Sequence, residues 1–277
     1  MKFIFLDDSR QKNPKRARMG PLVGVGGIIV DADALGSLES EIDLICTKSY
    51  RFPARAMFKW SPGSGDWFRS AIIGEEREAF YADVLLACKN HAARAVVAVC
   101  DVTKTKANSS ATDSEIDALI LTLERFHTSL SSSEPGFVVV AKPSGGTTSE
   151  NKMLATCMEH KSIGTDYVKF SKLAQNPVVM QSAHSRVLQA ADLVVSVTTA
   201  MVSGNTEYAE KIFPMVSRLF LRDWRGLIGG TGLKVHPFLL YKNLHFWVLQ
   251  EDAYAKGSTG WSLPENSCPY ASNPLIY

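Results

Sequence analysis

Short apolar runs and amphipathic segments alternate through the first part of the chain. The apolar runs at residues 2–7 and 22–30 predict two strands, and the polar loop at 10–20 between them predicts a β-hairpin. Glycines in the second run allow another backbone or a ligand to approach closely. Residues 33–50 predict a helix, because their apolar side chains share one stripe: Leu35, Leu38, Ile42 and Ile45.

The same alternation continues to about residue 202. The pattern predicts helices over 75–91, 113–130, 152–160 and 183–202, the last with Ser182 as N-cap, and strands over 94–101, 137–141 and 178–181. A hairpin followed by alternating helices and strands predicts an α/β fold with a mixed sheet flanked by helices. We expect a core domain over residues 1–204 and a C-terminal extension over 205–277. The extension is expected to hold a helix near 206–221 and an irregular tail with Pro264, Pro269 and Pro274.

Composition indicates a globular protein with a substantial core. The chain has 277 residues, of which 45% are hydrophobic and 21% charged, as expected for one large domain or a domain with an extension. Its net charge of +2 is too small to indicate a partner by itself. The charges must therefore be examined by position.

Cysteine spacing and the apolar runs indicate the compartment. The five cysteines are scattered without a C-x-x-C pair, which argues against a zinc site, and several lie in apolar runs, as buried thiols of a reducing compartment do. The apolar run at the N-terminus is too short for a signal peptide, and no segment is apolar enough to span a membrane. We expect a cytoplasmic protein without membrane contact. The oligomeric state stays open, with a homodimer among the alternatives.

Aspartates stand where the pattern expects apolar residues or strand ends. Asp7 and Asp8 follow the first apolar run, and Asp101 follows the apolar run at residues 96–100. Asp192 interrupts the apolar stripe of the helix over 183–202. Burying a carboxylate is costly unless it is paired or bound to a metal, and parallel strands gather their carboxyl ends where α/β proteins bind ligands. We therefore predict that Asp7, Asp101 and Asp192 form a metal site.

Each acid also has a structural interpretation. Asp192 could meet an arginine or water, and Asp101 could form an Asx-turn with Thr103. Asp7 and Asp8 point to opposite faces of a regular strand, so Asp7, on the face of Phe3 and Phe5, is the member that joins the site. Asp8 could cap a turn.

The chemistry that suits such a cluster is phosphoryl transfer. Mg²⁺ and Mn²⁺ prefer carboxylate oxygens, and ions held in this way can activate a water and stabilise a leaving oxygen. Basic residues crowd the same region, with five cations in the nine residues 10–18. We predict metal-dependent hydrolysis of a nucleic-acid backbone, with Gln189 and His184 orienting the phosphate. The predicted nucleic-acid contacts are Arg10, Lys12, Lys15, Arg16, Lys59, Lys104 and Lys142.

Several motifs together resemble the domain-of-unknown-function 3800 (DUF3800) family, over most of residues 1–240. They are Phe5-Leu6-Asp7-Asp8-Ser9, Phe58-Lys59-Trp60-Ser61, Val140-Ala141-Lys142-Pro143-Ser144-Gly145-Gly146, and Ser182-Ala183-His184-Ser185 with Leu188-Gln189-Ala190-Ala191-Asp192-Leu193. The resemblance implies a ribonuclease H-like fold and a nuclease, in a family whose genes often lie near bacterial antiviral or mobile-element genes. It implies Asp7 as the first-strand ligand and Asp192 as the last-helix ligand, with Asp101 as a further candidate.

This chain departs from the family pattern at two positions. Met57 and Ala141 stand where family members often carry acids. The site would then bind one ion, recruit Asp8 or Asp66, or be inactive, so a degenerate nucleic-acid-binding or scaffold subunit is the alternative function. A phospho-accepting receiver domain is a more remote alternative, because a loop with Pro14 and a second strand follow Asp7 and Asp8 in place of a helix. At the acidic pair, the Asp-x-Asp spacing of haloacid-dehalogenase phosphatases is absent, since residue 9 is Ser9.

Overall fold

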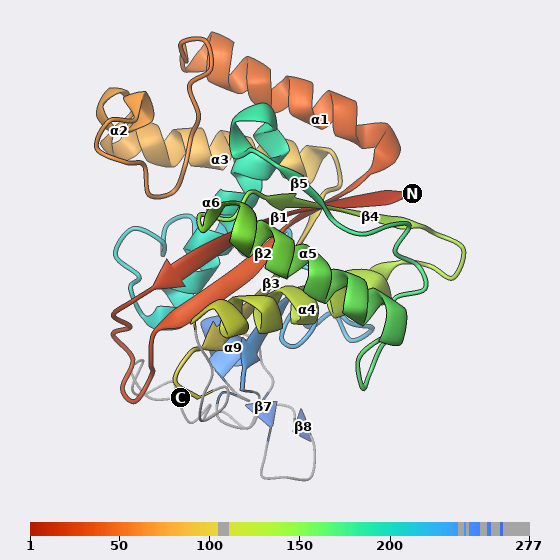
Figure 1. The fold of residues 1–277 in the computed structure, drawn as a ribbon. Helices are drawn as coiled ribbons and strands as arrows, with labels where there is room; N and C mark the ends of the chain where they lie inside the picture. The colour runs from red at the N-terminus through yellow and green to blue at the C-terminus, as the bar shows by residue number, and fades with distance from the viewer. Residues whose placement is uncertain (105–110, 238–240, 242–243, 250–253, 256–260, 263–277) are drawn as a thin grey trace.

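A computed structural model gives the arrangement of the chain for residues 1–104, 111–237, 241, 244–249, 254–255 and 261–262. One six-stranded mixed sheet organises it, in the order β5-β4-β1-β2-β3-β6 (Figure 1). The strands are β1 (Lys2–Gln11), β2 (Leu22–Asp31), β3 (Arg94–Asp101), β4 (Gly136–Ala141), β5 (Val178–Met180) and β6 (Leu233–His236). Two short strands, β7 (Tyr254–Ala255) and β8 (Trp261–Ser262), pair with each other.

The predicted hairpin starts the sheet. β2 runs antiparallel to both β1 and β3, whereas β4 is parallel to β1, β5 to β4, and β6 to β3. A mixed α/β sheet that begins with an antiparallel hairpin is compatible with a ribonuclease H-like fold. It differs from the parallel 2-1-3-4-5 sheet of flavodoxin-like receiver domains.

Helices cover both faces of the sheet. On one face lie α6 (Arg186–Ser203), α1 (Ala32–Leu44) with its π-helical continuation Ile45–Ser49, α3 (Gly74–Asn90) and the short α2 (Trp67–Ala71) and α7 (Phe213–Ser217). On the other lie α4 (Ala111–Ser129) and α5 (Gly146–Ile163) (Figure 1). The 3-10 turn Ser182–His184 precedes α6, and α9 (Leu244–Val248) packs on α6 and β6. Within the described part of the chain, no helix is both long and apolar enough to cross a bilayer.

The alternation of side chains along β1 places two separate cores on the two faces. Phe3 and Phe5 pack with α6, and Ile4 and Leu6 pack with α4 and α5. This confirms the predicted separation of Asp7 from Asp8. Asp7 continues the α6 face and Asp8 the α4 face.

Some predicted boundaries were wrong. The helix over 183–202 begins at Arg186, and its N-cap is Ser185, whose Oγ accepts a hydrogen bond from the Leu188 N–H, rather than Ser182. α5 begins at Gly146, six residues before the predicted start, and the expected long helix near 206–221 is reduced to α7. β6, which was not predicted, joins part of the expected extension to the sheet beside β3. The tail with Pro264, Pro269 and Pro274 lies outside the described residues.

Candidate active site

The packing of α6 on the hairpin brings Asp192 to Asp7. Gly24 and Gly27 of β2 make this possible. A Cβ atom at Gly27 would lie 2.9 Å from the Ala191 Cβ, and one at Gly24 would lie 2.2 Å from the Thr199 Oγ1. Glycine therefore lets the helix lie directly on the strands, as the sequence predicted. Asp192, the next residue after Ala191, is in this way brought close enough to Asp7 for the two carboxylates to repel each other.

Asp7 and Asp192 form an electrostatically unfavourable pair. Burial raises the pKa of Asp7 well above its usual value, and repulsion from Asp192 raises it further; a hydrogen bond of 2.8 Å from the Asp8 N–H to the Asp7 Oδ1 opposes this. Burial also raises the pKa of Asp192, against the hydrogen bonds donated by the Trp60 N–H and the Ser196 hydroxyl. Lys59 lowers the pKa of both aspartates by charge attraction. Such a pair favours a proton or a cation between its oxygens.

Lys59 is held near the pair because α6 binds the segment 56–60 through three side chains on one face. Arg186 Nη1 donates to the Ala56 carbonyl (2.8 Å), the Phe58 N–H to Gln189 Oε1 (3.2 Å), and the Trp60 N–H to Asp192 Oδ2 (2.9 Å). The Tyr81 hydroxyl adds a bond of 2.8 Å to the Lys59 carbonyl. The three helical residues are three apart, so they share a face and contact alternate residues of the segment.

This arrangement assigns Gln189 a structural contact in place of the predicted phosphate contact. The side chain is buried, its Oε1 accepts from the Phe58 N–H, and its Nε2 donates to the Ser182 carbonyl (2.8 Å). His184 is exposed before α6, in an open groove that is lined also by Glu39 and Asp43 of α1. The structure therefore does not bring His184 to the Asp7–Asp192 pair.

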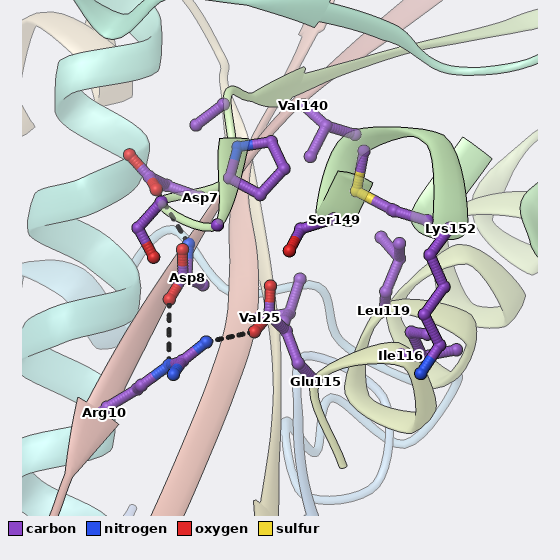
Figure 2. A pocket seen from close by; sticks show the side chains of 15 residues that line it. Asp7, Asp8, Arg10, Val25, Glu115, Ile116, Leu119, Val140, Ser149 and Lys152 are labelled. Atoms are coloured by element: carbon purple, nitrogen blue, oxygen red, sulfur yellow. Dashed lines mark hydrogen bonds and ion pairs between the residues drawn. The ribbon is translucent and has the colours of Figure 1, made fainter. Parts of the chain in front are cut away.

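A second group of charges lies across the sheet. Arg10 bridges the carboxylates of Asp8 and Glu115, with 3.6 Å from its Nε to Asp8 and a hydrogen bond to Glu115 (Figure 2). Burial raises the pKa of both acids, and Arg10 lowers them in part. Glu115, on α4, was missed by the sequence analysis, because nothing in the polar start of that helix distinguishes it from a solvent-facing residue.

A pocket of about 180 Å³ opens where β1 extends beyond the carboxyl end of its neighbour β4. The pairing of these strands ends at Leu6 and Val140, and β1 then continues to Gln11 along the pocket. Asp7, Asp8, Arg10 and Glu115 contribute to its wall, and Ser149 and Lys152 of α5 line the opposite side (Figure 2). The pocket lies at the carboxyl ends of parallel strands, the usual ligand position in α/β folds.

Asp101 lies elsewhere in the sheet. Leu22 of β2 pairs with Gln11 on one side and with Asp101 on the other, so Asp101 lies level with Gln11 in the sheet. Gly26 pairs in the same way with Asp7 and Val97, so Asp7 lies level with Val97. Four residues along and two strands across correspond to roughly 16 Å between the Cα atoms of Asp7 and Asp101. Asp101 is fully buried and accepts hydrogen bonds from Gly20 N, from Thr103 N and Oγ1, and from the Tyr241 hydroxyl. Its bonds to Thr103 fit the alternative Asx-turn.

Apart from Lys59, which lies near the Asp7–Asp192 pair, the predicted basic contacts divide into two groups. Arg16 is buried and caps the carboxyl end of α6, donating to the carbonyls of Val202 (2.6 Å) and Met201 (2.9 Å). Arg10 is held between two acids, as described. Four lysines are exposed near the carboxyl ends of the parallel strands, and Lys142 also lies 3.9 Å from Glu150; they are Lys12, Lys15, Lys104 and Lys142. These lysines can meet a polyanion at this end of the sheet.

The donor set of the pair fits Mg²⁺ or Mn²⁺. Among the described residues, no three His, Cys, Asp or Glu side chains gather as ligands of one ion. Ala141 follows the last residue of β4 that pairs with β1 and packs on the α6 face, beside Asp7, at the position where the DUF3800 resemblance implies an acid. Asp66 accepts a hydrogen bond from Gly63 N in a separate loop. In Mg²⁺ sites the protein usually supplies one or two carboxylates as ligands, and the phosphate oxygens of the substrate supply others.

Comparison with known proteins indicates no function, so the function has to be inferred from the residues of this chain. A scan against family models, a search of curated proteins and a search of solved structures each gave no match. The resemblance to the DUF3800 family therefore rests on the quoted motifs and on the fold.

Proposed function

We propose that the protein hydrolyses nucleic-acid phosphodiester bonds with the help of Mg²⁺ or Mn²⁺. One observation carries this: Asp7 and Asp192, far apart in the sequence, lie close enough for their carboxylates to repel each other, just beyond the point where the pairing of β1 with β4 ends. Burial raises the pKa of both carboxyls, and repulsion from Asp192 adds to the rise for Asp7. Carboxylates that repel each other in this way bind a divalent cation favourably, since the cation relieves both the burial and the repulsion.

Each side chain has a defined part in this proposal. Asp7 and Asp192 would hold the ion, which supplies water activation and stabilisation of the leaving oxygen when bound. The Lys59 ammonium, held near the pair by the contacts of α6 with segment 56–60, attracts the scissile phosphate. The exposed lysines Lys12, Lys15, Lys104 and Lys142 attract the flanking backbone, which makes binding dependent on salt.

The motif resemblance supports the same function. It implies Asp7 and Asp192 as ligands in a ribonuclease H-like fold, and the hairpin-first mixed sheet is compatible with that fold. The buried cysteine thiols at 46, 88, 100 and 157 support a reducing, cytoplasmic location as part of this proposal.

The test compares Asp192→Asn with a matched exposed control. Asp33→Asn makes the same change on α1, at an exposed position at the other end of β2. Labelled single- and double-stranded RNA and DNA would be incubated with Mn²⁺, Mg²⁺ or a chelator. We expect metal-dependent cleavage that Asp192→Asn reduces by more than the roughly 10–100-fold typical of losing an outer-shell partner of a metal. Undiminished cleavage by folded Asp192→Asn would refute the assignment.

The second candidate is a binding subunit without catalysis, and Ala141 favours it. A third acid is missing beside Asp7, so the cation could be held too weakly for hydrolysis. Calorimetry with Mn²⁺ separates the two functions. Salt-sensitive nucleic-acid binding without Mn²⁺ binding and without cleavage would establish the binding subunit.

A further inference from the structure

An aromatic pocket lies on the α6 side of the sheet, apart from the pocket in Figure 2. Its volume is about 290 Å³, and it lies between α3 and the segment 205–212, with Trp60 on one wall. Its lining includes Trp60, Tyr208 and Ile212, together with Tyr81, which is only 2% exposed. The volume is near the lower end, about 300 Å³, of small-molecule sites, so one ring system fits better than an extended ligand.

The charged residues of this pocket are already compensated. Arg77 donates to the carbonyls of Phe68, Arg69 and Ile72, and its guanidinium lies 5.3 Å from the centre of the Phe68 ring. Glu78 receives hydrogen bonds of 2.7 and 2.9 Å from the Lys211 ammonium. The pocket therefore suits a flat, neutral ring rather than an ion.

Trp60 and Tyr208 are the aromatic side chains of the lining that a ligand can reach. Trp60 packs on the buried ring of Tyr81, with ring centres 5.5 Å apart, and Tyr208 is 71% exposed. An exposed aromatic ring can pack against another ring in an offset-stacked or edge-to-face arrangement. Nucleobases offer such a face, whatever their sequence.

The pocket and the Asp7–Asp192 pair share segment 56–60. The backbone N–H of Trp60 donates to Asp192, and the Tyr81 hydroxyl donates to the carbonyl of Lys59. The wall of the pocket is thus built by the same segment that brings Lys59 near both aspartates. Because Trp60 lines the pocket and its backbone contacts Asp192, the pocket and the pair are neighbours.

We propose that this pocket stacks a base of single-stranded nucleic acid whose neighbouring phosphate lies at Asp7 and Asp192. This inference rests on the proposed function and adds the substrate class. Bases in a duplex are already stacked on each other, so only an unpaired or extruded base can enter a pocket of this kind. The protein therefore selects single strands over duplexes of the same sequence.

Tyr208→Ala tests the proposal with little risk to folding, because the side chain is exposed. Tyr167→Ala is the matched control: Tyr167 is 87% exposed and lies in the loop after α5, near the amino end of β4. Affinity for a labelled single-stranded oligonucleotide and for its duplex would be measured by fluorescence anisotropy, in a chelator, so that no cleavage occurs. Tyr208→Phe keeps the ring and removes the hydroxyl.

We expect Tyr208→Ala to weaken single-strand binding by about 5- to 150-fold, the range for loss of a stacked base. Tyr208→Phe and Tyr167→Ala should bind like the wild type, and duplex should bind more weakly than single strand. Equal affinity of Tyr208→Ala and wild type, absence of oligonucleotide binding, or a preference for duplex would overturn the pocket assignment. Asp192→Asn tests the proposed hydrolysis separately, since this variant should lose cleavage of nucleic acid and still bind the single-stranded oligonucleotide.

Discussion

Asp7 and Asp101 look alike in the sequence and differ entirely in the structure. Each follows an apolar run and stands on one of two parallel strands of the same sheet. Asp101 is buried with hydrogen bonds from Gly20, Thr103 and Tyr241 around its carboxylate. Asp7 faces a second carboxylate, and burial and repulsion raise its pKa. A buried acid with its own donors stabilises the fold, whereas one that faces another acid is prepared for a ligand.

The largest effect that would test this contrast is the loss of stability in Asp101→Ala. The substitution leaves the N–H groups of Gly20 and Thr103 and the Tyr241 hydroxyl without their acceptor. We expect the free energy of unfolding to fall by about 3–5 kcal/mol, measured by urea denaturation. Tyr241→Phe removes a single hydroxyl and should cost about 1 kcal/mol. Unchanged stability together with lost Mn²⁺ binding would place Asp101 in the metal site instead.

A smaller effect would come from adding a third acid beside Asp7. Ala141→Asp places a carboxylate on the α6 face, next to Asp7 in the sheet. Because affinity for a hard cation rises with the number of charged ligands, we expect Mn²⁺ to bind roughly tenfold more tightly in calorimetry. Ala141→Asn is the neutral control of equal size. Equal affinities for the Asp and Asn variants would show that position 141 does not face the ion.

The smallest expected effect is a gain of stability in Asp7→Asn without divalent cations. The folded-state pKa of Asp7 is raised, so its contribution to stability is fully present below the unfolded pKa near 3.9 and is lost as pH rises through the folded value. The neutral amide removes this loss. We expect a gain at pH 7 within the roughly 0.5–2 kcal/mol of single stabilising substitutions.

Melting temperatures measured across a pH series in chelator would check this gain. The Asp7→Asn variant should lose less stability than the wild type as pH rises, while Asp33→Asn should follow the wild type. A wild type that grows more stable relative to Asp7→Asn over this range would contradict the raised pKa. It would also remove the electrostatic reason for a cation at the pair.

The apolar pattern predicted most of the fold because strand faces and helix stripes are local properties. The alternation in β1 correctly separated Asp7 from Asp8, and the stripe in residues 183–202 located α6. The predicted N-cap of α6 was wrong because two nearby serines compete for that position. Ser182 and Ser185 are both good N-caps, and the structure uses Ser185, whose hydroxyl also donates to Glu39 of α1.

The candidate site was predictable only in part. The position of Asp192 on a core-facing stripe predicted an acid in need of a partner, and its role as a metal ligand stays a prediction. Gln189, three residues earlier, binds the backbone of residue 58. Nothing local distinguishes these outcomes, since both side chains project from the same face of α6. The partner segment 56–60 arrives from a distant part of the chain, and its path is set by packing.

The order of apolar and polar residues, taken alone, determined the class of the fold and the face on which each acid of β1 lies. Tertiary structure alone decided which acids meet. Strand register places Asp101 level with Gln11, and the helix packing allowed by Gly24 and Gly27 brings Asp192 to Asp7. Periodicity is written in neighbouring residues, but the satisfaction of a buried carboxylate depends on donors such as Gly20 and Tyr241, 81 residues before and 140 residues after Asp101.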